Sequence, residues 1–187
     1  MNSPERRRSS VRWTSKVVDA FDDGDVAGAL LEGAVWDLAW WSPDVRPGAY
    51  AVLRAGTQYY LVADRAKEVF AAVKKSGRRA LTRDVEHHPW FATPLRRGQM
   101  NRDPELGPRD DTNYGWFVES AAPAKLGVPG TAGAAWTAYV LAYRTLGSND
   151  LVTFVPGIGI TAFTFVHHGT LAEAYVHLAA FRRGGGR

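Results

Sequence analysis

The sequence predicts a single α+β domain in which an N-terminal pair of helices precedes antiparallel hairpin–helix units around one sheet. Apolar residues near both ends of the chain recur at helical spacing, and two β-branched, aromatic hairpin patterns are each followed by a helix-like segment. The 187 residues are 45% hydrophobic, which is enough for one core. We expect the domain to span residues 1–187, with flexible tails at 1–8 and 183–187.

The N-terminal helical pair is expected over residues 9–21 and from Asp25 to about residue 41. Asp25 can cap the second helix, and the acidic, glycine-containing stretch before it separates the two. The stripes that predict the helices are Trp13, Val17 and Phe21 in the first, and Leu31, Val35 and Leu38 in the second.

The strongest local pattern is a hairpin of residues 49–54 and 57–63 around the turn Ala55-Gly56. Asp64 can cap the helix that follows, and Gly77 is a typical residue at a helix end. This part of the chain therefore predicts a strand–strand–helix unit.

The C-terminal half is expected to repeat this order. A strand is predicted at residues 114–119 and a helix over 131–147, followed by a hairpin of residues 151–155 and 160–167. Residues 170–173 read Thr-Leu-Ala-Glu, a capping box that predicts a final helix over about 170–182.

Residues 78–114 form a long irregular segment rich in proline and glycine, with one short strand expected at 80–86. A loop of this length in a compact domain is usually functional. If a strand runs from Leu81 to His88, alternation would place Asp84, Glu86 and His88 on one face, where carboxylates and an imidazole could hold a divalent metal that activates water. One reading is therefore a metal-dependent hydrolase or nuclease. The ligand set is incomplete, so no metal or other cofactor is expected.

Basic residues predict a different function. The formal net charge is +4, and the acidic residues cluster elsewhere, at 19–25 and 103–111. Separated basic patches are typical of proteins that bind phosphates, and nearby aromatic rings can stack on unpaired bases. The residues expected to contact nucleic acid are Lys74, Lys75, Arg78, Arg79, Arg83, Arg96 and Arg97, with Trp90 and Phe91 as the stacking pair.

A third reading concerns three tryptophans, Trp36, Trp40 and Trp41, on the second expected helix. They cannot all face one narrow core stripe, and an exposed apolar patch often marks an interaction surface. These residues predict a protein partner or a homo-oligomer, and hence a protein–protein adaptor.

The sequence favours the second reading: a basic, non-enzymatic binding protein that contacts nucleic acid or forms part of a larger nucleoprotein or protein assembly. The absence of cysteine excludes disulfides, thiolate metal sites and cysteine nucleophiles. No apolar leader follows the arginines at 6–8, and Pro156 interrupts the most apolar stretch. We therefore expect a soluble, cytoplasmic protein that does not enter membranes.

Overall fold

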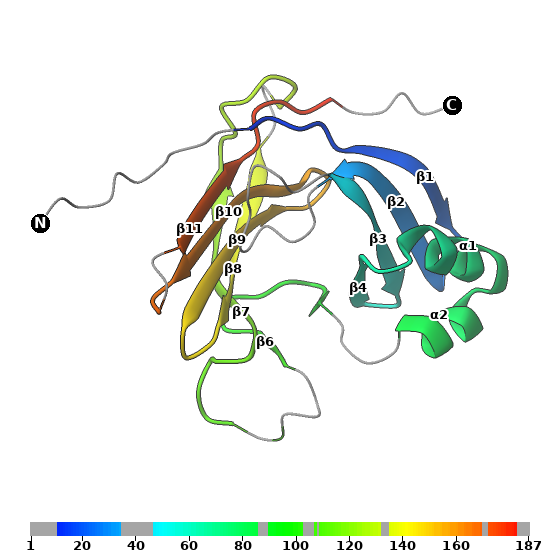
Figure 1. Cartoon of the computed structure of the whole chain (residues 1–187), viewed down its shortest axis with the longest axis horizontal. Coiled ribbons are helices and arrows are strands. Elements are labelled where there is room, and N and C mark those ends of the chain that lie inside the picture. Colours follow the sequence, from blue (N-terminus) through cyan, green and yellow to red (C-terminus); the bar gives the residue numbers. More distant parts are fainter. Residues whose placement is uncertain are drawn as a thin grey trace, which may run out of the picture.

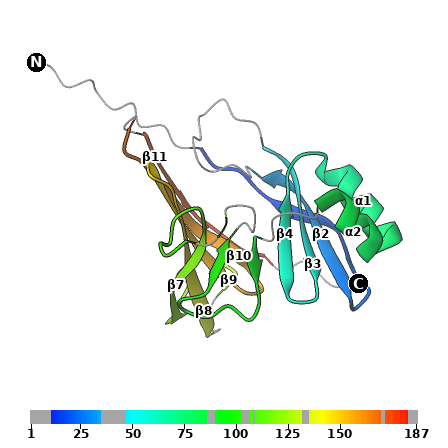
Figure 2. The ribbon, with the colours of Figure 1, turned by 90° about the horizontal axis from the view of Figure 1, so that it is seen from below.

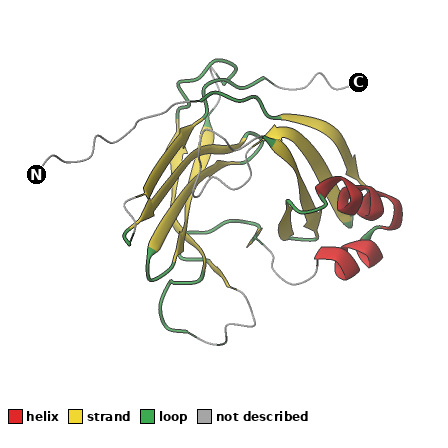
Figure 3. Ribbon diagram, viewed as in Figure 1, coloured by secondary structure: helices red, strands yellow, loops and turns green. Residues whose placement is uncertain are grey.

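The computed structural model describes residues 11–34, 47–85, 90–102, 107, 109–131, 135–169 and 172–182. Two antiparallel sheets dominate these residues, with two helices beside them (Figure 3). Sheet A has the strand order β1-β2-β3-β4-β5, and sheet B has the order β11-β10-β9-β8-β7-β6. The expected α+β fold, with an N-terminal helical pair and hairpin–helix units around one sheet, is therefore wrong: the protein is mostly β.

Sheet A consists of β1 (Lys16–Asp22), β2 (Val26–Ala34), β3 (Gly48–Ala55), β4 (Gln58–Val62) and β5 (Phe91–Ala92). Consecutive strands pair antiparallel throughout.

Residues 16–34, which cover parts of both expected N-terminal helices, form the β1–β2 hairpin instead, and residues 35–41 of the second expected helix lie outside the described residues. The acidic stretch between the two expected helices forms the hairpin turn: Gly24 adopts φ 91°, and its N–H donates to Asp22 Oδ1 at 2.9 Å. The Val26 N–H donates to Asp23 Oδ1 at 2.8 Å. Side chains that could have capped a helix thus stabilise a turn between two strands. Pairing of β2 with β3 then satisfies the backbone across the sheet.

The β3–β4 hairpin is confirmed, with Ala55 opposite Gln58. The helix after it is also confirmed as α1 (Ala66–Ser76), which buries Val69, Phe70 and Val73 and ends at Gly77. Its N-cap residue is Arg65, with φ 51° and no side-chain cap, rather than Asp64. The amphipathic stripe and the terminal glycine therefore predicted this helix better than the cap did.

The strand expected at residues 80–86 is wrong, because α2 (Arg78–Val85) occupies this stretch. The Gly77 carbonyl accepts the N–H groups of Ala80 and Leu81, which starts the second helix directly after the first. Ala80 and Leu81, which belong to this second helix, are buried. The expected irregular segment is thus helical at its start, and it also contains β5 and β6.

Sheet B consists of β6 (Met100–Arg102), β7 (Gly115–Ala124), β8 (Trp136–Arg144), β9 (Ser148–Val155), β10 (Gly159–His167) and β11 (Ala172–His177). The expected strand at residues 114–119 and the hairpin at 151–167 are confirmed as β7 and as β9–β10. The helices expected over 131–147 and 170–182 are wrong, since β8 and β11 lie there.

Two buried clusters hold the layers together. The helix-side core lies between sheet A and the helices and includes Leu53, Phe70 and Val73. The aromatic core lies on the inner face of sheet B and includes Val118, Phe163 and Phe165. Figures 1 and 2 show sheet A between sheet B and the two helices.

Strand β4 joins the two cores, because its adjacent tyrosines face opposite sides. Tyr60 is buried in the helix-side core, whereas Tyr59 packs against the aromatic core. The Tyr59 ring stacks on Phe91 with centroids 5.0 Å apart, and Phe91 lies 5.2 Å from Phe154 of β9. The short strand β5 therefore hydrogen-bonds with sheet A while its Phe91 ring fills the core of sheet B.

Both ends of the described chain pack on sheet B. Trp13, which precedes β1, lies against the aromatic core. The Phe181 N–H donates to the Pro129 carbonyl at 2.9 Å, which fixes the segment after β11 against the loop between β7 and β8. Neither α1 nor α2, the helices of the described residues, is long and apolar enough to cross a membrane.

Candidate functional site

Four basic residues meet where α1 joins α2, a surface that we call the basic corner. Lys74 and Lys75 lie in the last turn of α1, and Arg78 and Arg79 open α2. Gly77 makes the turn between them with φ 55°, and its N–H donates to the Val73 carbonyl at 2.8 Å. All four basic residues are on the outermost layer of the molecule. The end of α1 and the start of α2 thus place these four cations, which lie between positions 74 and 79, on one surface.

The acidic stretch at residues 19–25 lies against this corner rather than away from it. Lys74 Nζ is 2.7 Å from Asp19 Oδ1, and Arg78 Nη1 is 3.6 Å from Asp25 Oδ1. The hydrogen bond from Lys74 lowers the pKa of Asp19. In the part of the chain that the structure describes, Lys75 and Arg79 make no ion pair with a carboxylate. The expected separation of basic and acidic residues is therefore lost on folding, and carboxylates engage two of the four cations.

Sequence reasoning missed Asp19 and Asp25 as neighbours of the corner. Residues 9–21, which include Asp19, were expected to form a helix that ends at residues 22–25. Alternation along β1 and the Asp-Gly turn were the patterns that could have indicated a hairpin reaching back to the helices.

Arg83 and Asp84 lie at the other end of α2. Arg83 donates to both carboxylate oxygens of Asp84, from Nε at 2.7 Å and from Nη2 at 2.6 Å. This pairing lowers the pKa of Asp84. Because α2 is a helix, the alternation that would have aligned Asp84, Glu86 and His88 does not apply here. Glu86 and His88 lie outside the described residues.

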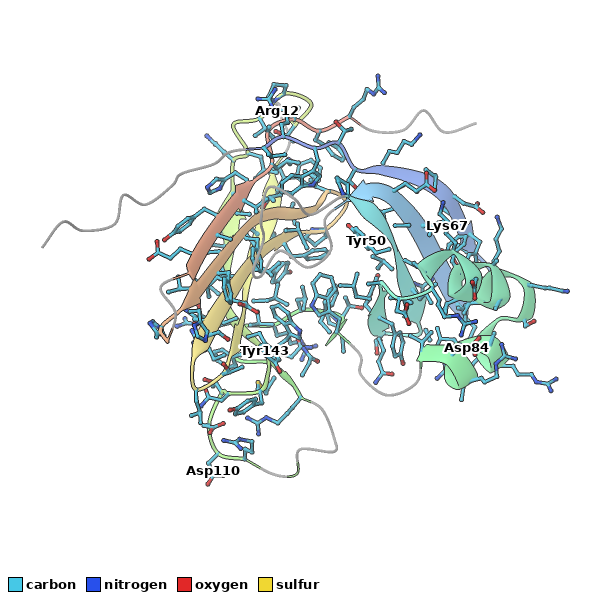
Figure 4. The ribbon with its side chains drawn as sticks, viewed as in Figure 1. Arg12, Tyr50, Lys67, Asp84, Asp110 and Tyr143 are labelled. Carbon is cyan, nitrogen blue, oxygen red and sulfur yellow. The ribbon has the colours of Figure 1, made fainter. Side chains whose placement is uncertain are left out.

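Asp84, labelled beside the helices in Figure 4, borders a cleft of about 690 Å³ between the end of β4, the start of α1 and α2. Its floor includes Leu61, Val62 and Val69, and its rim carries charged residues. On that rim Arg65 pairs with Glu68 at 2.6 Å, so two carboxylates are each held by an arginine. No group of three or more metal-ligating side chains occurs among the described residues. The cleft is therefore lined by apolar side chains together with two arginine–carboxylate pairs.

The proposed stacking pair lies away from the corner, on the side of sheet B. Phe91 is only 2% exposed in the aromatic core, so its ring is not available to a base. Trp90 is half-buried and meets Trp116 edge-on, with centroids 5.9 Å apart. These rings fill the space between the sheets.

Arg96 and Arg97 are exposed in a turn that is bound to β7, where the Gly98 N–H donates to the Val118 carbonyl at 2.8 Å. Sheet A separates this turn from the helices in both ribbon views (Figures 1 and 2). The structure thus does not bring the arginine turn and the basic corner into one site. The three tryptophans of the adaptor reading, Trp36, Trp40 and Trp41, lie outside the described residues.

Comparisons with protein-family models, with curated proteins and with solved structures find no match to this chain.

Proposed function

We propose that this protein is a non-enzymatic binding protein that contacts nucleic acid through the basic corner. The observation that carries the proposal is the pair of exposed cations, Lys75 and Arg79, beside Lys74 and Arg78 on the outermost layer. Basic side chains on one protruding surface bind phosphates by displacing condensed counterions. Such contacts read the backbone rather than the bases.

The neighbouring carboxylates determine how strong this binding should be. Asp19 and Asp25 already engage Lys74 and Arg78, so a phosphate must compete with them for these two cations. Lys75 and Arg79 need no such exchange. We therefore expect weak binding with little sequence preference, which decreases steeply as salt rises.

The test is a fluorescence-anisotropy titration of labelled single-stranded and duplex oligonucleotides at several salt concentrations. Replacing Lys75→Glu and Arg79→Glu together should weaken binding to all probes by about tenfold or more at low salt. It should also reduce the slope of log K against log salt by about 2, since each phosphate contact contributes about 1.

A matched control makes the same change of charge on the side of sheet B, by Lys125→Glu with Arg182→Glu. Both residues are exposed. This variant should keep most of the affinity. An equal loss of affinity in the two variants would mean that binding depends only on the net charge of the protein. The absence of binding at micromolar protein in low salt would refute the proposal.

A further inference from the structure

Strand β11 is an open edge of sheet B. It pairs with β10 on one side, and no other strand of the described residues pairs with its second side. The Leu178 N–H donates to the Thr161 carbonyl of β10 at 2.9 Å. Because hydrogen-bonding direction alternates along an antiparallel strand, Ala174 and Val176 also bond toward β10. The N–H and C=O groups of residues 173, 175 and 177 therefore point away from β10, and those of Tyr175 and His177 can pair with another strand.

The other edge strands of the described residues are protected in ways that β11 is not. Strand β5 has two residues and β6 has three, which is too short for a stable added strand. Strand β1 contains a register shift between Val17 and Asp19 and begins with Lys16. Short strands, bulges and edge lysines are known means of preventing edge-to-edge pairing. Strand β11 has six residues in continuous register with β10 and contains neither lysine nor proline.

The side chains of β11 fit a second copy of the same strand. We propose that two copies of this chain associate through β11, antiparallel about a twofold axis at Tyr175, and so extend sheet B across the dimer. In this register Tyr175 faces Tyr175 of the second copy, and Glu173 faces His177 at both ends. A twofold axis makes each contact occur twice.

Each face of the added ladder is complementary. On the outer face Tyr175 is 60% exposed, and its hydroxyl donates to Glu173 Oε2 of the same chain at 3.3 Å. Glu173 and His177 are exposed as well, so the carboxylate of one copy and the imidazole of the other lie side by side at the surface. A cross-strand hydrogen bond between a carboxylate and an imidazole and a cross-strand aromatic pair each stabilise a sheet. On the inner face Ala174 of one copy meets Val176 of the other, which continues the aromatic core. Pairing one residue out of register would place inner side chains on the outer face.

Sedimentation velocity over a dilution series of the full chain tests this arrangement. The unmodified chain should show a reversible monomer–dimer equilibrium. His177→Glu should raise the dissociation constant by about tenfold or more, because it places two carboxylates opposite each other at both ends. Glu173→Lys should also weaken the dimer, by placing lysine opposite histidine. Mixing these two variants should restore dimers, since the introduced lysine then faces the introduced glutamate at one end, and the native His177 faces the native Glu173 at the other.

The lack of cysteine in the chain permits a second test that reads the register directly. Tyr175→Cys should form a disulfide-linked dimer on mild oxidation, because residues paired on the axis have Cα atoms about 5.5 Å apart. Glu173→Cys should not, since the two copies of position 173 lie about 14 Å apart in this register.

Tyr175→Pro separates association from folding. The Tyr175 N–H points away from β10, so proline here removes no backbone hydrogen bond to β10, although the hydrogen bond from the Tyr175 hydroxyl to Glu173 Oε2 is lost with the side chain. This variant should keep the circular dichroism spectrum and lose the dimer, whereas Val17→Lys on the β1 edge should leave the dimer intact. A chain that stays monomeric at all concentrations would overturn the proposal. So would a dimer that resists Tyr175→Pro or is abolished by Val17→Lys.

Discussion

The outer face of sheet A is covered by two helices, whereas the outer face of sheet B carries no helix of the described residues (Figure 1). Under the helices, Leu53 and Phe70 are buried almost completely. On the outer face of sheet B, Thr164 and Val166 are half-exposed and Tyr175 is exposed. Both sheets are antiparallel meanders of consecutive strands. The comparison indicates that a covering layer, rather than strand pairing itself, decides which face stabilises the protein and which remains available to partners.

Removing a large side chain from either core should give the largest effect. Phe70→Ala in the helix-side core and Phe165→Ala in the aromatic core should each lower the free energy of unfolding by about 3–5 kcal/mol. Val166→Thr on the open face of sheet B should cost less than about 1 kcal/mol. Urea unfolding measures all three variants.

The same variants test whether β4 couples the cores. In a background with Trp36, Trp40 and Trp41 replaced by Phe, the remaining tryptophans lie on the side of sheet B, so their fluorescence reports on that part, while circular dichroism reports on the whole chain. Phe70→Ala should shift both signals by the same amount, because Tyr59 and Tyr60 belong to one strand. A fluorescence midpoint that stays in place would show that the two sheets unfold separately.

Gly130→Ala should have the next largest effect. Gly130 has φ 90°, and a Cβ there would lie 1.5 Å from the Phe181 carbonyl oxygen. The segment after β11 would have to move away from Pro129, and the backbone would be strained. We expect a loss of more than about 1 kcal/mol in the free energy of unfolding. Gly107→Ala, also at positive φ but in open space, is the control for backbone strain alone.

The loop between β6 and β7 should show a larger pH effect than Asp19 on sheet A. Hydrogen bonds from Arg109 lower the pKa of Asp111 to about 2, with a further contribution from the Asn113 N–H. A carboxyl whose pKa falls on folding stabilises the folded state above its unfolded value and loses that contribution as pH falls. The stabilising contribution of Asp111 should therefore be complete above about pH 5 and decline toward about pH 2. An NMR titration of Asp111 in the parent and in Arg109→Gln, where the pKa should rise, checks this.

The smallest effect is expected at the basic corner. Asp19→Asn releases Lys74 from its carboxylate partner, so nucleic-acid binding should tighten by a few fold at low salt. Glu119→Gln, which loses a carboxylate on sheet B that pairs with Arg144, is the matched control and should leave binding unchanged. If both variants bind nucleic acid equally more tightly, the effect depends on net charge and not on the basic corner.

The parts of the fold that the sequence predicted correctly had patterns with only one interpretation. The β3–β4 and β9–β10 hairpins pair a glycine turn with β-branched strands, and α1 has a single apolar stripe that ends at Gly77. The predictions failed where both faces of a strand are apolar. In β8, Tyr139 and Leu141 face the aromatic core while Val140 and Ala142 lie on the opposite face, so apolar residues also occur at helical spacing.

The prediction for strand β11 was wrong for a different reason, because its residues do show the pattern of a strand. Ala174 and Val176 alternate with Glu173, Tyr175 and His177, which is the pattern of a strand with one buried face. The predicted helix at 170–182 relied instead on the Thr-Leu-Ala-Glu capping box. A short motif at a helix start cannot compete with pairing to β10, which satisfies the backbone along the whole strand.

At the candidate site, the sequence predicted that cations cluster at a helix end. The structure brings Lys74, Lys75, Arg78 and Arg79 together but places Arg83 at the other end of α2. The sequence could not predict that Asp19 and Asp25 would lie beside these four, because that contact depends on the pairing of β1 with β2 and on the packing of sheet A under α1. The burial of Phe91 likewise depends on the position of sheet B, which no local pattern reveals.

The sequential strand order has a consequence for synthesis of the chain. Sheet A comes entirely from residues 16–92 and sheet B from residues 100–177, so each sheet forms from one continuous stretch. The first sheet and its helices can therefore assemble on the ribosome before the second has been made. Trp13 is the exception, since its packing surface on sheet B comes from the far end of the chain. Trp13 is made before both sheets and should nevertheless be among the last of the described side chains to reach its final position.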